Sequence, residues 1–380
     1  MTKLAGGLII GRDRAAAITT SGGLIISMDA DASGGPGDRE IDITGLVVAP
    51  GLIDLQVNGG YGSDFTTDPE SIWLVGARLP EQGVTAFLPT IITSPPEATE
   101  AARAALAARP VDYQGAEPLG LHLEGPMLSP KRPGVHDPEL MRSPTVDLVR
   151  GWTPGGGVAM VTMAPELAGS QVVIRALSDA GVVVSAGHSA ATLAEAEAGF
   201  AWGASAVTHL FNAMEPFDHR APGLIGAIVR HKSAIAGIIA DGLHSDPAVV
   251  LAAWKWLGPA RLALVTDSMA ATGLGDGEYR LGHAAVTVKQ GKGTDSNGRL
   301  AGSTLTMDRA VRNLVGFAGC SPAEAVAAAS TVPARLLGRD DRGRLAVGNR
   351  ADLVLFDEAM EVVATMVGGQ LAYVQEGWAL

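Results

Sequence analysis

Eight short apolar runs, separated by segments with helical spacing, restrict how this chain can fold more than any other feature. The runs are rich in β-branched residues and are bounded by Gly, Pro or polar residues, which is typical of strands. They cover residues 51–57, 84–92, 118–124, 157–163, 181–187, 205–210, 233–240 and 261–267. Segments rich in Ala, Glu and Leu, such as residues 96–110 and 189–203, lie between them. Strands therefore alternate with helices, and this order predicts parallel strands joined by helical crossovers.

The number of these units selects one architecture. Eight strand and helix units over roughly 290 residues match the size of a (β/α)8 TIM barrel. An open doubly wound sheet would more often carry a glycine-rich phosphate loop after its first strand. We therefore predict the α/β fold class, with a TIM barrel over residues 51–345.

The two ends of the chain differ from the middle. Residues 1–50 and 346–380 contain short strand-like pieces separated by Gly, Asp and Ser. Neither stretch could bury both of its faces alone. We predict that both termini together form one small β-sandwich domain beside the barrel.

Charge and composition exclude several classes of partner. The net charge is −12 and the sequence pI is about 5.1, which argues against a nucleic acid or an anionic membrane as the main partner. A small anionic substrate could still bind through local basic groups. No apolar stretch reaches the ~18 residues of a membrane span, and the N-terminal apolar run is too short for a signal peptide, so we expect a cytoplasmic protein. The only cysteine, Cys320, lies in a helical pattern and is expected to be an inert core thiol.

Polar side chains gather at the carboxyl ends of the predicted strands, where TIM barrels carry their active sites. Because these ends meet at one mouth, we expect the side chains to surround one site. They are Gln56 and Asn58 in the first strand, His122 and Glu124 in the third, His188, His209 and Asp267 at later strand ends, and His244 after the seventh strand.

Three of these residues have the chemistry of a metal site. A carboxylate with two imidazoles is a common ligand set for a catalytic divalent ion and leaves a position for water. Glu124, His188 and His209 supply that set from three separate strands. Each histidine alone could instead satisfy a buried hydrogen bond, but their joint position favours a metal. His122 lies on the same side of its strand as Glu124, although only one of the two need be a ligand.

Asp267 ends a strand whose other inner positions are aliphatic. A buried charge must be compensated or used. Near a cation it would stay ionised and could accept a proton from water. The alternative is a helix N-cap with Ser268 behind it.

Seven motifs occur along the chain in this order: "PGLIDLQVNG", "LHLEGPML", "GHS", "THLFNAM", "GIIADGLHSD", "LVTDSMAATG" and "LAGSTLTMDRAV". With these motifs the chain resembles a known family, the N-acetylglucosamine-6-phosphate deacetylases of the amidohydrolase superfamily. The resemblance runs from about residue 45 to 357 and includes a characteristic order of motifs. It implies a metal-dependent hydrolase barrel that converts N-acetylglucosamine 6-phosphate to glucosamine 6-phosphate and acetate, in amino-sugar catabolism and cell-wall recycling.

The same resemblance implies roles for individual residues. Glu124, His188 and His209 would hold the metal, Asp267 would act as catalytic acid and base, and His136 would polarise the acetyl carbonyl. Arg220 would reach the active site of a partner subunit, which implies a two-fold homodimer. The implied substrate contacts are Val135, His136, Asn212, Ala213, Arg220, Asp241, His244, Leu300, Ala301 and Gly302.

Gln56 and Asn58 stand where many amidohydrolases carry His-x-His, two ligands of a second metal. Amide side chains are poor ligands for zinc or iron, so we expect one tightly held ion and hydrogen-bonding roles for both amides. Zn²⁺ is expected, and Fe²⁺, Mn²⁺ and Co²⁺ also fit the donor set. Residues 127–137 contain Gly, Pro and two adjacent cations, which favours a loop that closes over substrate.

Three other functions are compatible with the same features. The metal site could act on another N-acylated amino sugar or on a cyclic amide, the barrel could bind a sugar phosphate as a regulator, or it could be a metal-independent isomerase. Comparing the hydrolysis of phosphorylated and unphosphorylated N-acetylhexosamines tests for another substrate. The complete set of Glu124, His188, His209 and Asp267 argues against a regulator without catalytic activity. Full activity after removal of metal by a chelator would favour the isomerase.

Overall fold

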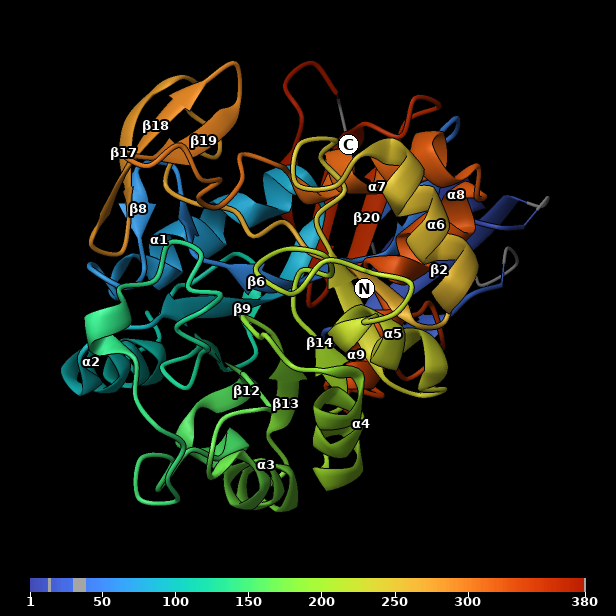
Figure 1. Ribbon diagram of the computed structural model, residues 1–380. Coiled ribbons are helices and arrows are strands. Elements are labelled where there is room, and N and C mark those ends of the chain that lie inside the picture. Colours follow the sequence, from blue (N-terminus) through green and yellow to red (C-terminus); the bar gives the residue numbers. More distant parts are fainter. Residues whose placement is uncertain (13–14, 30–38, 379–380) are drawn as a thin grey trace.

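The computed structural model describes residues 1–12, 15–29 and 39–378, and the predicted barrel lies at its centre (Figure 1). Residues 13–14, 30–38 and 379–380 of the predicted terminal domain lie outside the described residues. Every predicted barrel run contains a strand, and these strands are parallel and follow one another in sequence order. The barrel strands are β6 (Leu52–Val57), β9 (Val84–Ile92), β11 (Leu121–Glu124), β12 (Val158–Met163), β13 (Val183–Ala186), β14 (Ala206–Val207), β15 (Ile235–Ile238) and β16 (Leu262–Leu264).

The ring closes between the end of β16 and β6. Asn58 N donates to Ser268 O at 2.8 Å, and Asp267 N donates to Gln56 O at 2.9 Å. A two-residue strand, β10 (Glu117–Pro118), also pairs with β9. The carboxyl ends of the barrel strands therefore surround one mouth, as predicted for this fold.

Helices cover the outside of the barrel (Figure 1). Their sequences explain their positions: α4 begins with a capping box of Thr192 and Glu195, and α3 buries Val173 and Leu177 on one face. Cys320, between α7 and α8, is buried and free. The α-helices are α1 (Ser71–Arg78), α2 (Pro96–Ala107), α3 (Ser170–Asp179), α4 (Leu193–Trp202), α5 (Gly223–Arg230), α6 (Pro247–Leu257), α7 (Met307–Ala318), α8 (Pro322–Ala328) and α9 (Thr331–Leu336).

Three short 3-10 helices complete the helical elements of the described chain. They are η1 (Leu79–Gln82), η2 (Pro138–Leu140) and η3 (Pro154–Gly156). Across the described residues, none of the helices combines the length and the apolar character that a membrane crossing needs.

Both termini build one separate mixed sheet, which confirms the predicted fold class. β5 and β20 join its N-terminal and C-terminal strands, and the order is β22-β21-β20-β5-β1-β2-β3 with β4 beside β1. The sheet has its own aliphatic core, including Leu4, Ile18 and Leu353. The boundaries between this domain and the barrel, at residues 50 and 345, stay a prediction. The strands of the terminal sheet are β1 (Thr2–Ile9), β2 (Ala15–Ser21), β3 (Leu24–Ser27), β4 (Arg39–Asp42), β5 (Val47–Pro50), β20 (Leu353–Phe356), β21 (Val362–Val367) and β22 (Gln370–Val374).

A third sheet was not predicted. β17 (Gly277–Leu281), β18 (Ala284–Lys289) and β19 (Lys292–Asp295) form an antiparallel meander after β16, drawn in orange in Figure 1. A small ribbon of β7 (Gly59–Gly60) and β8 (Ser63–Asp64) also follows β6. The meander packs on the barrel mouth through an apolar cluster made of Ile92, Met269, Ala271, Leu281, Val286, Val288 and Ala301.

Candidate active site

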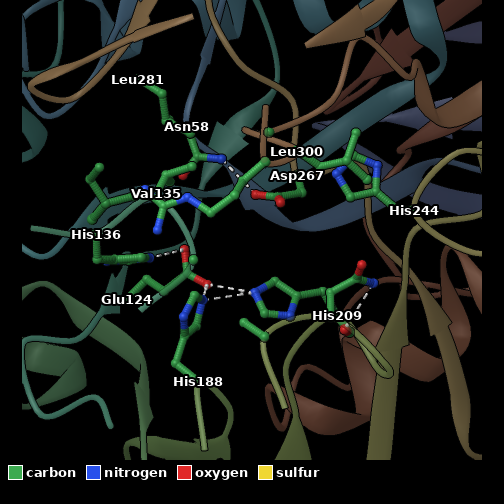
Figure 2. Close-up of a pocket in the computed structure, with 16 residues that line it drawn as sticks. Asn58, Glu124, Val135, His136, His188, His209, His244, Asp267, Leu281 and Leu300 are labelled. Carbon is green, nitrogen blue, oxygen red and sulfur yellow. Dashed lines mark hydrogen bonds and ion pairs between the residues drawn. The ribbon is translucent and has the colours of Figure 1, made fainter. Parts of the chain in front are cut away.

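Glu124, His188 and His209 converge from three different strand ends (Figure 2). The Nε2 atoms of His188 and His209 lie 3.1 and 2.9 Å from Glu124 Oε1 and 3.1 Å from each other. All three residues are buried, and one ligand atom from each lies within 4.8 Å of the others. The fold therefore brings the three predicted metal ligands together.

The donor atoms of this cluster suit a divalent metal. His188 Nδ1 lies 3.0 Å from the carbonyl oxygen of Arg132, and since a carbonyl only accepts, Nδ1 carries the proton and Nε2 presents its lone pair to the cluster. Burial raises the pKa of Glu124, but the neighbouring His188 and His209 outweigh burial and lower that pKa well below its ordinary value. An ionised carboxylate and two imidazole nitrogens aimed at one point are the expected ligands of such an ion.

Several site residues have a left-handed backbone, which is uncommon for residues other than glycine. The φ angles are 46° at His188, 28° at His209, 49° at Ala213 and 51° at Asp267. His188, His209 and Asp267 each follow a barrel strand by two or three positions, so the chain turns sharply where these side chains must face the mouth. Such conformations persist only where the surrounding contacts hold them, and they cluster at functional sites.

Asp267 is held by an amide from the first strand. Asn58 Nδ2 donates to Asp267 Oδ1 at 2.7 Å, and Gln56 Nε2 donates to Glu124 Oε1 at 3.2 Å. Burial, with the negative charge of Glu124 nearby, raises the pKa of Asp267 to about 6. A carboxyl group with such a pKa can accept and return a proton near neutral pH.

His136 reaches the cavity from the 127–137 segment. The backbone N–H of Thr93 donates to its Nδ1 at 3.2 Å, so Nδ1 is the acceptor and Nε2 carries the proton. Nε2 lies 3.7 Å from Glu124 Oε2, at the metal cluster. Burial and the neighbouring His188 lower the pKa of His136 to about 3. His136 is therefore a neutral N–H donor that can polarise a carbonyl oxygen.

These residues line a cavity of about 250 Å³ at the barrel mouth (Figure 2). The predicted residues that line it are Asn58, Glu124, Val135, His136, His188, His209, Asn212, Ala213, His244, Asp267, Leu300 and Gly302.

Four predicted residues do not line this cavity: Gln56, Arg220, Asp241 and Ala301. His244 Nδ1 is 2.7 Å from Asp241 Oδ2, and although burial raises the pKa of Asp241, its hydrogen bonds with His244 hold it below the ordinary value. Gln56 and Ala301 are buried beside the cavity without lining it. Arg220 is exposed and lines a different pocket, beside Glu215.

His122 is fully buried and takes no part in the cavity wall. Its ring lies between the hydroxyl groups of Thr90, at 3.2 Å, and Thr162, at 2.7 Å. Burial lowers the pKa of His122 to about 4. Of the two titratable residues at this strand end, Glu124 alone belongs to the ligand cluster.

Four further residues line the cavity that the sequence analysis did not identify. They are Ile92, Gly134, Leu281 and Arg299. Leu281 and Arg299 come from the unpredicted meander or its last turn. Alternating exposure along residues 284–289 corresponds to a period-two pattern in the sequence, which could have identified the sheet.

Comparisons with known proteins agree with this geometry. The amidohydrolase family pattern matches residues 47–372. The chain is 41% identical over 354 residues to N-acetylglucosamine-6-phosphate deacetylase of Homo sapiens, covering 88% of this chain and 86% of that protein. It is 40% identical over 339 residues to the protein of that name from Bacillus subtilis (strain 168), covering 87% and 85%. A solved mutant deacetylase from Mycobacterium smegmatis, in complex with N-acetyl-D-glucosamine-6-phosphate, superposes with a TM-score of 0.90 at 34% identity, over 98% of this chain and 99% of that one.

Proposed function

The chain belongs to the amidohydrolase family, and within it to the N-acetylglucosamine-6-phosphate deacetylases, and we propose that it hydrolyses the acetamide bond of N-acetylglucosamine 6-phosphate. The products are glucosamine 6-phosphate and acetate, and the reaction serves amino-sugar catabolism and cell-wall recycling. One observation carries the proposal: Glu124, His188 and His209 meet within 4.8 Å of one another in a cavity that Asp267 and His136 also line.

The proposed cofactor is one divalent ion, Zn²⁺, held by Glu124, His188 and His209. An ion in such a ligand set lowers the pKa of water and polarises a carbonyl group. Gln56 and Asn58, which hydrogen-bond to Glu124 and Asp267, leave little basis for a second tightly bound ion. Fe²⁺, Mn²⁺ and Co²⁺ are the competing ions, and elemental analysis of the purified protein decides among them.

Two residues of the chain manage charge and protons in the proposed reaction. The Nε2–H of His136 donates to the acetyl oxygen and stabilises the negative charge that develops there. Asp267 takes the proton of the attacking water and delivers it to the sugar nitrogen, because an amine leaves poorly unless it is protonated. Asn58 holds the carboxylate of Asp267 in the orientation that both transfers need.

We place the proposed phosphate site at His244, Asn212 and Ala213, which line the same cavity as the metal ligands. Ionised Asp241 accepts from His244 Nδ1, so Nε2 of His244 is available to the substrate. Asn212 and Ala213 line the same cavity as His244. A chain with net charge −12 needs such local donors to hold a sugar phosphate.

Arg220 completes this site in the proposal from the second subunit of a two-fold homodimer. In one subunit it is exposed and outside the cavity. Phe217, three positions before Arg220 in the chain, is 49% exposed, and its ring lies 5.5 Å from that of Trp256, which is 39% exposed. Exposed apolar groups of this kind favour a protein interface. Sedimentation of the wild type and of Phe217→Ser tests the dimer, and a monomeric wild type would contradict it.

The decisive experiment measures acetate release and metal content on the same preparation. We expect rapid release from N-acetylglucosamine 6-phosphate, slower release from unphosphorylated N-acetylglucosamine, and loss of release after chelation. Higher kcat/KM with N-acetylgalactosamine 6-phosphate would assign the site to that substrate. Full activity without metal would overturn the proposal. The cytoplasmic location stays a prediction that fractionation of the source cells can test.

A further inference from the structure

One ion pair joins two segments that both border the candidate active site. Arg132, in the 127–137 segment, contacts Glu215 through two hydrogen bonds, Nε to Oε1 at 3.1 Å and Nη2 to Oε2 at 2.5 Å. The side chains are 33% and 38% exposed. This forked geometry orients a guanidinium and a carboxylate as well as attracting them.

The middle of the 127–137 segment has few other polar anchors. Residues 130–135 are exposed or half-buried, and among the described contacts this pair is the only hydrogen bond or ion pair that their own side chains make. The ends of the segment are fixed: Ser129 N donates to His188 O at 2.9 Å, and His136 is buried against Thr93. The pair therefore supplies the only polar side-chain anchor that residues 130–135 themselves provide among the described contacts.

That part of the segment contacts a metal ligand directly. The carbonyl of Arg132 accepts from His188 Nδ1 at 3.0 Å. Gly134 has a φ of 58°, and a Cβ there would lie 2.9 Å from the ring of His188, so the backbone packs closely on that ring. The next residue, Ser189, donates its backbone N–H to Ala213 O at 3.1 Å. The two segments that the ion pair joins therefore both contact residues 188–189.

We propose that Arg132 and Glu215 are positioning residues, whose ion pair holds residues 130–135 closed against residues 212–215. Neither touches the reacting atoms. Closure keeps the carbonyl of Arg132 on His188, which orients that ligand toward the metal, and keeps Val135 and His136 on the cavity wall. This inference rests on the proposed deacetylase function for its kinetic test but not for its metal-binding test.

The expected effect follows from a simple equilibrium. If substrate and metal bind the closed state, their apparent dissociation constants rise in inverse proportion to the closed fraction, while the rate of the bound complex is unchanged. A half-exposed ion pair contributes modestly, so Glu215→Gln should raise KM about 3- to 5-fold and leave kcat within about twofold. The metal dissociation constant, measured by chelator competition without substrate, should rise by a similar factor.

Charge reversal gives the sharper test. Glu215→Lys should raise KM and the metal dissociation constant about tenfold each. The exchanged pair R132E/E215R should return both constants to within about twofold of wild type. Lys131→Gln removes the adjacent exposed charge without touching the pair and controls for general attraction of the anionic substrate. Glu197→Gln removes the Arg230–Glu197 pair, which joins α4 to α5 at 3.1 Å, and controls for loss of any such pair. Neither control should change KM or metal affinity.

Two results would overturn the inference. Either Glu215→Lys keeps both constants within twofold of wild type, or the exchanged pair is no better than the single reversal. Circular dichroism of every variant shows whether it is folded. If the wild type releases no acetate from the phosphorylated substrate, the proposed function fails, whereas the chelator measurement still decides the role of the pair.

Discussion

The barrel mouth and the terminal sheet bury opposite kinds of side chain. The mouth holds His136, His188, His209 and Asp267 around Glu124, and most of these groups are nearly inaccessible to solvent. The hydrophobic cluster of the terminal sheet consists of aliphatic residues and Met, such as Leu353 and Val363, and the polar side chains buried within its strands are hydroxyls, such as Thr20 and Thr365. Because burying charge is unfavourable unless it is paired or used, the mouth is organised for chemistry and the sheet for stability. Substitutions in the two regions should therefore separate rate from stability.

The largest effect is expected at the mouth. Asp267→Asn removes the proposed proton carrier but keeps the size of the side chain, so kcat should fall by roughly 10²- to 10⁴-fold. Removing a buried charge should leave the melting temperature unchanged or higher. Acetate release, elemental analysis and thermal melting measure the three quantities. A variant with wild-type kcat and full metal content would exclude Asp267 as the proton carrier.

The terminal sheet should show the reverse behaviour. Leu353 is fully buried in β20, between β5 and β21, and Leu353→Ala should cost about 2–5 kcal/mol of unfolding free energy. The kcat of the folded variant should equal that of wild type. Val347→Ala, at a neighbouring position that is 62% exposed, is the matched control. Denaturant unfolding with assays below the transition tests this, and a large fall in kcat would show that the two regions are coupled.

Asp54 tests the cost of burying a carboxyl group that touches no substrate. It lies in β6 and accepts from the backbone N–H groups of Gln56 and Thr266 at 3.2 Å and from the hydroxyl of Thr266. Burial raises its pKa from 3.8 to about 7. Between these values the folded state holds the proton and the unfolded state does not, so this group makes stability fall as pH rises.

Asp54→Asn mimics the neutral carboxyl group and should remove that dependence. The variant should gain stability relative to wild type as the pH rises from 4 to 7, at about 1.4 kcal/mol per unit at most. Unfolding midpoints at both pH values provide the measurement. A difference between the two proteins that does not change with pH would show that Asp54 is already ionised at pH 4 in the folded state.

The positions of the barrel mouth and of the terminal sheet could both be predicted from the sequence. The eight strands follow from local periodicity and turn residues, and the polar groups at their ends indicate the mouth, because parallel strands must bring those ends together. The terminal sheet was predictable for a similar reason, since neither end could bury two faces alone. The β17–β19 meander was not predicted although its alternation is visible, because it contains no helix and so does not share the strand-and-helix repeat that identifies the barrel.

Finer features of the site depend on distant parts of the chain. The tautomer of His136 is set by Thr93, 43 positions away, and the Arg132–Glu215 pair spans 83 positions. Neither partner forms a motif with the residue that it contacts. The left-handed backbone at His209 and Asp267 is likewise imposed by surrounding contacts and opposes local preference. Local pattern therefore locates the site, while long-range packing sets its geometry.

The smallest expected effect lies on the meander, which shares features of both regions. It packs on the mouth through aliphatic residues, yet its last turn places Arg299 on the cavity wall. Asp295 holds the guanidinium through Nε at 2.8 Å and Nη2 at 2.7 Å, so the local charge is nearly balanced and its attraction for an anionic substrate is weak. Arg299→Met should raise KM for the phosphorylated substrate only about 2- to 4-fold, with kcat and melting temperature unchanged. Arg280→Met removes an exposed charge on β17 of the same sheet and should leave KM unchanged. If both substitutions raise KM equally, the meander attracts substrate by its total charge and not by a contact from Arg299.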